Sequence, residues 1–258
     1  MQNVIILGSG RSGTSMVTGL LSQAGYFMGE NLWDAGEGNP KGYFEDVEVN
    51  AINEDILAPV TPERPDNVLG RTIWRHRPRY WQRWATFISP QQKIECPFQV
   101  VHRIQRLVAK TPFCFKDPRF CYTLAAWKPF LPQNLTHIVV FRDPLTTALS
   151  TTKEAQNAYQ DLYMTTDRAL KIWQAMYSHI LDVHYLAGGD WLFVHYQQFL
   201  NSSSGFDRLE DKLGIKVDRN FPEQGLHRSK PLIKQPVNSA TLALYERLCR
   251  LANYPVQD

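Results

Sequence analysis

A glycine-rich loop between an apolar run and an amphipathic segment is the feature that most restricts how this chain can fold. Val4 to Leu7 form a short apolar run rich in β-branched residues, and Gly8-Ser9-Gly10-Arg11-Ser12-Gly13-Thr14-Ser15 follows it directly. Beyond the loop, apolar residues recur at helical spacing as far as Gly25, which is placed to end a helix. The sequence therefore predicts a buried parallel strand, a tight loop and a helix, in that order.

The same strand-to-helix alternation continues along the chain. Apolar strands are predicted at 113–115, 137–141 and 191–194, and a long amphipathic helix at 170–184. Asp143 and Pro144 offer an N-cap and a first-turn proline for a further helix. Alternating strands and helices predict an α/β fold with three layers, in which helices flank a central parallel sheet. Ligands of such sheets bind at the carboxyl ends of the strands, where Arg11, Lys116 and Arg142 fall.

Composition limits what kind of protein this is. The chain has 258 residues without a visible repeat or linker, and we take 1–258 as a single domain. Its 28 basic and 25 acidic residues leave a net charge of +3, which argues against nucleic acid as a partner. The four cysteines and seven histidines show no metal-ligand spacing, so no metal site is predicted. No secretory signal and no apolar stretch of membrane-spanning length are present, so we expect a soluble, cytoplasmic protein.

A segment at about 59–112 departs from the strand-and-helix pattern. Between Thr61 and Pro90 it carries six arginines interleaved with tryptophan and tyrosine. One interpretation is acceptor recognition, with arginines for acidic groups and aromatic rings for stacking. The other, slightly favoured, is a pair of amphipathic helices whose arginines extend around a tryptophan seam. We refer to 59–112 as the excursion.

The loop chemistry indicates phosphate binding. Its glycines allow close backbone approach, and free N–H groups at a helix start attract anions. Thr14 stands where the nucleoside-triphosphate loop pattern G-x-x-x-x-G-K-[ST] requires lysine, and Arg11 becomes the obvious cation. A tight turn without a ligand is the alternative.

Arg11-Ser12-Gly13-Thr14-Ser15 resembles the 5′-phosphosulfate loop [KR]-S-G-[TS]-[TS] of sulfotransferases, which use 3′-phosphoadenosine 5′-phosphosulfate (PAPS) as sulfuryl donor. A second segment resembles the 3′-phosphate motif of that family, because Ser150 follows Arg142 by eight residues after an apolar strand. Alternatives for this segment are an ordinary salt bridge between Arg142 and Asp143, or a Walker-B-like strand whose Asp143 holds magnesium.

The resemblance implies a P-loop NTPase-like sulfotransferase fold and roles for individual residues. Arg11 to Ser15 would bind the 5′-phosphosulfate, and Arg142 and Ser150 the 3′-phosphate. Lys116, in a Lys-Asp-Pro segment like that of the protein-tyrosine branch, would stabilise the transferring group. Arg228, in a basic loop near the end, is a further candidate for donor contact. The product would be adenosine 3′,5′-bisphosphate, and no metal is implied.

The family's cytosolic branch places a catalytic histidine two residues after the lysine, but Pro118 stands there in this chain. We therefore select Glu45, because Asn39 to Glu45 resembles the N-P-K-G-[FY]-F-E segment of bacterial sulfotransferases. Partial desolvation between aromatic neighbours would make its carboxylate a stronger base. The alternative for Glu45 is capping of the following helix, and the reserve bases are Asp46, Asp117 and Glu30.

Three functions remain open from the sequence. The first is a PAPS-dependent sulfotransferase acting on a hydroxyl-bearing acceptor. The second is a small-molecule kinase of the P-loop type, against which Thr14 counts. The third is a catalytically inactive nucleotide-binding interaction protein that uses the excursion as a partner surface. The sequence specifies neither the acceptor nor the residue that stacks on adenine, and it leaves the oligomeric state open.

Overall fold

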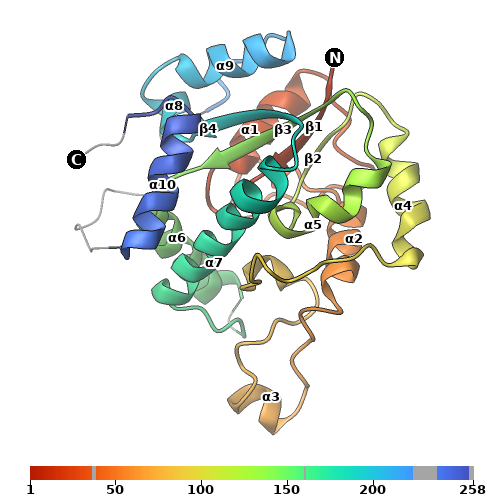
Figure 1. The fold of residues 1–258 in the computed structure, drawn as a ribbon, viewed down its shortest axis with the longest axis vertical. Coiled ribbons are helices and arrows are strands. Elements are labelled where there is room, and N and C mark those ends of the chain that lie inside the picture. The colour runs from red at the N-terminus through yellow and green to blue at the C-terminus, as the bar shows by residue number, and fades with distance from the viewer. Residues whose placement is uncertain (37–38, 160, 223–236, 256–258) are drawn as a thin grey trace.

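The computed structural model describes residues 1–36, 39–159, 161–222 and 237–255. Within these ranges one parallel sheet has the strand order β2-β1-β3-β4 (Figure 1). The strands are β1 (Asn3–Leu7), β2 (Cys114–Lys116), β3 (Leu135–Phe141) and β4 (Asp190–His195). All four coincide with the predicted apolar runs to within two residues, so these predictions are confirmed.

Alternation along β1 explains why the sheet is covered on both sides. Ile5 and Leu7 join one hydrophobic core, and Val4 and Ile6 join the other. All four side chains are fully buried. Because successive side chains of a strand point to opposite faces, an unbroken apolar run needs helices on both faces. The predicted three-layer α/β architecture is therefore confirmed.

The helices divide between the two cores. The face of Val4 and Ile6 packs against α1 (Thr14–Gln23), α8 (Gln197–Leu200) and α9 (Ser204–Leu213). The opposite face packs against α2 (Val47–Leu57), α4 (Phe98–Val108), α5 (Phe120–Trp127), α6 (Pro144–Ala158), α7 (Thr166–Ser178) and α10 (Ser239–Leu251). Short helical turns occur at η1 (Arg83–Ala85), η2 (Lys128–Phe130) and η3 (His179–Tyr185). None of the helices in the described ranges is long and apolar enough to cross a bilayer.

Two local predictions for helix boundaries are also confirmed. The Asp143 carboxylate accepts a hydrogen bond of 2.7 Å from the Thr146 backbone N–H, and Pro144 occupies the first turn of α6. The long amphipathic helix predicted at 170–184 is α7 continued by η3, where the helix widens to a π-helical turn. Asp143 therefore caps α6.

The connections place a topological switch point beside β1. From β1 the chain continues to β2 on one side, and β3 occupies the other side. In open parallel sheets the loops after two such strands diverge and leave a crevice at their carboxyl ends. The loop 8–15 follows β1, and Arg142 follows β3 directly. Both sequence motifs therefore lie at this crevice.

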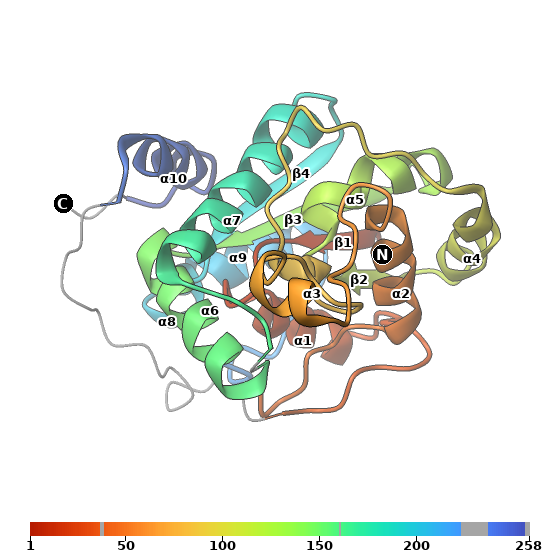
Figure 2. The ribbon, with the colours of Figure 1, turned by 90° about the horizontal axis from the view of Figure 1, so that it is seen from below.

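The excursion contains α4 and, before it, a part with little regular structure, of which α3 (Val68–Thr72) lies below the sheet in Figure 1. Between Thr61 and Pro90 it forms α3 and η1, so the interpretation as a pair of amphipathic helices is wrong. Prolines at 62, 65, 78 and 90 interrupt helical hydrogen bonding, and several of the arginines bind carboxylates instead of covering a tryptophan seam. Seen from below, α3 lies in front of the central part of the molecule (Figure 2).

Candidate functional site

The glycine loop packs closely against neighbouring segments at two positions that only glycine can occupy without a clash. Gly8 has φ 152°, and a Cβ there would lie 2.3 Å from the Val140 carbonyl oxygen. Gly13 has φ 94°, and a Cβ there would lie 2.2 Å from the ring of Tyr196. Gly13 also caps α1 without any side-chain hydrogen bond, and the first turn of α1 carries no acidic residue. The N-terminus of α1 therefore carries neither a capping side chain nor an acidic side chain that would compete with an anion.

Tyr177 of α7 forms hydrogen bonds with the glycine loop and with β3. Its hydroxyl donates to the Val140 carbonyl at 2.8 Å and lies 3.0 Å from the Ser12 hydroxyl. Ser12 is fully buried, and its hydroxyl also lies 2.7 Å from that of Ser9. Burial raises the pKa of the Tyr177 hydroxyl, which therefore stays protonated. Both polar groups of Ser12 serve the loop's internal structure, because its backbone N–H also donates to the Ser9 carbonyl at 3.3 Å.

Tyr177 lies within the amphipathic helix predicted at 170–184, but sequence reasoning missed its contact with the glycine loop. A tyrosine at an apolar position of such a helix indicates a hydroxyl that needs a partner in the core, but the partner itself is set by the packing of α7.

Arg11 brings the two sequence motifs together. Its Nε donates to the Ser150 hydroxyl of α6 at 3.2 Å, and its guanidinium lies 3.9 Å from the Glu154 carboxylate. Arg142 is buried, and its guanidinium carbon lies 5.3 Å from the ring centroid of Tyr196. The pKa of Arg142 is lowered, mainly by burial and also by the positive charge of Arg11. Tyr196 and Asp143 oppose this shift only in part. The two arginines therefore share one region of the crevice.

Lys116 connects this region to the segment that contains Glu45. Its Nζ donates to the Glu45 carboxylate at 2.5 Å and to the Ser15 hydroxyl at 3.1 Å. Ser15 also accepts a hydrogen bond of 2.7 Å from the Asn39 side chain. Lys116 is 3% exposed. The end of β2, the Asn39 to Glu45 segment and the loop 8–15 thus meet at a single ammonium group. We call the loop 8–15 the phosphate loop, after its predicted ligand.

The other candidate bases are occupied elsewhere. Asp46 caps α2 by accepting from the backbone N–H groups of Glu48 and Val49, so the interpretation of Glu45 as the cap is wrong. Glu30 is an exposed residue that pairs with Lys110.

Asp117 is fully buried. It accepts from Asn50 and Asn53 at 2.8 and 2.9 Å and pairs with Arg119 at 2.9 Å. Of the four candidate carboxylates, Glu45 is the one that reaches Lys116.

An aromatic wall lies beside the loop and was not identified from the sequence. A Cβ at Gly10 would lie 3.4 Å from the ring of Trp84, and Trp84 packs edge-on against Tyr159 at 5.7 Å. Burial raises the pKa of the Tyr159 hydroxyl, and the hydroxyl of Tyr43 and the carboxylate of Glu45 add to this effect. Trp84 belongs to the excursion, so this segment reaches the phosphate loop directly.

Two expectations concern other parts of the chain. Arg228 lies outside the residues that the structure describes. Over the described ranges, no group of three or more histidine, cysteine, aspartate or glutamate side chains is arranged to hold a metal ion. The four cysteines are unpaired with one another.

The fold and the loop define a three-layer α/β protein with a P-loop-like glycine loop at the switch point of its sheet. The family model described as the sulfotransferase family matches residues 3–219, and the chain belongs to this family. A comparison with curated proteins gives no match. The family assignment and the P-loop-like sulfotransferase fold predicted from the two motifs are therefore confirmed.

Two solved structures share the fold. The sulfotransferase domain from the Synechococcus PCC 7002 olefin synthase has a TM-score of 0.54 at 14% identity, over 99% of this chain and 95% of that one. The sulfotransferase domain from the curacin biosynthetic pathway has a TM-score of 0.51 at 14% identity, over 99% of both chains. At this identity the likeness extends to the fold alone.

Proposed function

We propose that the protein transfers the sulfuryl group of PAPS to a hydroxyl of an acceptor. The observation that carries the proposal is the position of the Lys116 ammonium, which contacts both Ser15 of the phosphate loop and Glu45. These three residues come from three separate segments. Their proximity provides one place where a donor phosphosulfate and an acceptor hydroxyl can bind side by side.

In this proposal the donor spans the crevice between β1 and β3. The backbone N–H groups at the start of α1, with Arg11, bind the 5′-phosphosulfate. Arg142 and Ser150 bind the 3′-phosphate, supported by the contact between Ser150 and Arg11. Tyr196 packs against both Gly13 and Arg142, so its ring lies between the two proposed phosphate anchors.

The chemistry is an in-line displacement at sulfur. The bond between sulfur and the bridging oxygen of the donor breaks, and a bond between sulfur and the acceptor oxygen forms. The leaving phosphate gains negative charge, which fixed cations stabilise. A lysine ammonium has three N–H donors, of which Ser15 and Glu45 take two, and we assign the third to the leaving oxygen.

Glu45 accepts the proton of the acceptor hydroxyl in this scheme. Phe44, directly before it, has φ 54°, and its ring packs on Phe221 at 6.3 Å. A left-handed conformation is unfavourable for a bulky residue, so packing must hold it in place. This packing fixes the direction in which the chain presents Glu45 to Lys116.

A thermal-shift comparison tests the donor assignment. Adenosine 3′,5′-bisphosphate should raise the melting temperature, because a ligand bound by the native state alone stabilises it, and magnesium ATP should not. Arg142→Gln should remove most of the shift. Arg247→Gln is the matched control, because that arginine is exposed and pairs with Asp182 on the surface. A shift with magnesium ATP and none with the bisphosphate would favour the kinase and end this proposal.

A further inference from the structure

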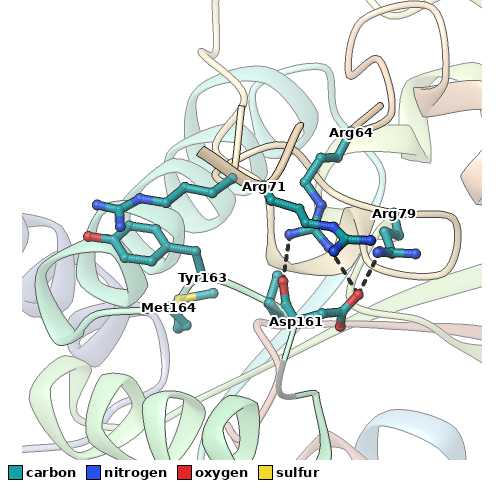
Figure 3. Close-up of a pocket in the computed structure, with 8 residues that line it drawn as sticks. Arg64, Arg71, Arg79, Asp161, Tyr163 and Met164 are labelled. Atoms are coloured by element: carbon teal, nitrogen blue, oxygen red, sulfur yellow. Dashed lines mark hydrogen bonds and ion pairs between the residues drawn. The ribbon is translucent and has the colours of Figure 1, made fainter. Parts of the chain in front are cut away.

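A cavity of about 430 Å³ lies between the excursion and the connection from α6 to α7. Four arginines line one side of it, and residues 161–164 line the other. Figure 3 shows Arg64 and Arg79 converging on Asp161, with Arg71 beside them and Tyr163 and Met164 nearby. We call this cavity the arginine pocket.

Asp161 fixes one wall of the arginine pocket. Its carboxylate pairs with Arg64 at 3.0 Å and with Arg79 at 2.7 Å. The Gln82 side chain donates to the same carboxylate at 3.0 Å. One negative charge thus orients two guanidinium groups, and the wall keeps a net positive charge.

The other two arginines add to this charge. Within the described residues neither Arg71 nor Arg75 forms an ion pair, and Arg75 lies over the ring of Tyr163 at 4.1 Å. A further carboxylate, that of Asp66, is 78% exposed and lies 3.6 Å from Arg79. Four guanidinium groups beside two carboxylates leave a positive charge that attracts an anion. A guanidinium group can donate two parallel hydrogen bonds to the oxygens of one carboxylate or phosphate.

The surroundings of the charge are apolar. Leu162 and Met164 line the pocket and are each 7% exposed. Val68, Leu69 and Ile73 of the adjacent α3 region are 75%, 48% and 63% exposed. An apolar surface beside a cationic cavity suits a ligand that carries an acidic group on an apolar body.

We propose that the arginine pocket binds the acidic group of the acceptor, a carboxylate or phosphate carried on an apolar body; this inference rests on the proposed function. The aromatic wall of Trp84 and Tyr159 is near the pocket in the chain, because Gln82, two residues before Trp84, donates to Asp161. Trp84 contacts the phosphate loop at Gly10 and packs on Tyr159, which precedes Asp161 by two residues. The acceptor would lie along this aromatic wall with its hydroxyl at Glu45.

Titration calorimetry with octyl phosphate, octanoate and octanol tests the pocket and separates the two kinds of acidic group. The anions should bind wild type, and octanol should bind at least tenfold more weakly. Arg71→Gln and Arg75→Gln should each weaken anion binding by roughly tenfold. Arg77→Gln should not, because that arginine stacks on Trp74 at 5.1 Å and does not line the pocket. Adenosine 3′,5′-bisphosphate should bind equally well to all four proteins.

Each result decides the inference. Equal binding of octanol and the anions, or anion binding unchanged in Arg71→Gln and Arg75→Gln, would overturn it. Displacement of octyl phosphate by adenosine 3′,5′-bisphosphate would also overturn it, because the anion would then occupy the phosphate loop. Anion binding that depends on Arg71 and Arg75, in a protein that does not bind the bisphosphate, would leave the pocket in place and remove the proposed function.

Discussion

Replacing Lys116 by methionine removes a positive charge that joins the phosphate loop to Glu45. Methionine keeps the length of the buried stem, so packing changes little and the lost ammonium dominates the effect. In the folded protein this ammonium makes two contacts, of 2.5 Å to Glu45 and 3.1 Å to Ser15. Neither contact requires a bound donor.

The effect on turnover should be much larger than the effect on donor affinity. Loss of one group that stabilises transition-state charge in a site closed to water costs about 2.7–4 kcal/mol, or roughly 100-fold to 1,000-fold in kcat. Ground-state donor affinity should fall by less than about fivefold, because the loop N–H groups and two arginines remain. The measurements are release of adenosine 3′,5′-bisphosphate from saturating PAPS with a panel of hydroxyl acceptors, and calorimetry with the same bisphosphate.

Stability gives an independent readout of the same change. Lys116→Met leaves the Glu45 carboxylate, whose side chain is 14% exposed, without its partner. We expect a loss of about 1–3 kcal/mol in the free energy of unfolding, and Glu45→Gln added to Lys116→Met should recover part of it. Lys110→Met, which breaks an exposed lysine–glutamate pair, is the control and should leave turnover unchanged. Equal losses of turnover and donor affinity in Lys116→Met would refute the catalytic assignment, and so would unchanged turnover.

Three further predictions concern the scaffold of the site. Gly13→Ala should lose about 2–4 kcal/mol of stability and most bisphosphate binding, since its new Cβ meets a tyrosine ring at 2.2 Å. Gly25→Ala, with a similar φ of 91° but open space around it, should lose about 1–2 kcal/mol, and equal losses would contradict the clash. Glu54→Gln should lower the free energy of unfolding by about 3–5 kcal/mol in denaturant, because two buried arginines pair with this fully buried carboxylate. Glu63→Gln is the control, because that side chain is 49% exposed. A loss in Glu54→Gln no larger than that in Glu63→Gln would disprove this prediction. Burial and a neighbouring arginine lower the pKa of His195 to about 3, so below the unfolded-state pKa of about 6.5 the unfolded chain binds a proton that the folded chain does not. Between pH 6 and 5, wild type should therefore lose about 1 kcal/mol more than His195→Gln as the pH falls, and parallel stability curves would contradict this reading.

The sequence by itself determined the elements of the sheet and the loop at its edge. The apolar run 4–7 must be buried on both faces, and the glycines after it allow the close turn into α1, whatever the rest of the chain does. Asp143 and Pro144 likewise start α6 through local hydrogen bonding. These signals are readable because their causes lie within a few neighbouring residues. They also placed Arg11, Lys116 and Arg142 at strand ends on one edge.

Tertiary structure decided which side chains meet at that edge. The contact between Lys116 and Glu45 joins residues 71 positions apart. The sequence favoured Glu45 as the base through a resemblance and kept Asp46, Asp117 and Glu30 in reserve. Tertiary packing gives the three reserve carboxylates other roles. Asp46 caps a helix, Asp117 pairs with a buried arginine, and Glu30 lies on the surface. The arginine pocket and the irregular course of the excursion have the same origin. Arg64, Arg79 and Arg83 pair with carboxylates on distant segments. The energy of such pairs depends on burial and distance in the folded chain, which neighbouring residues do not encode.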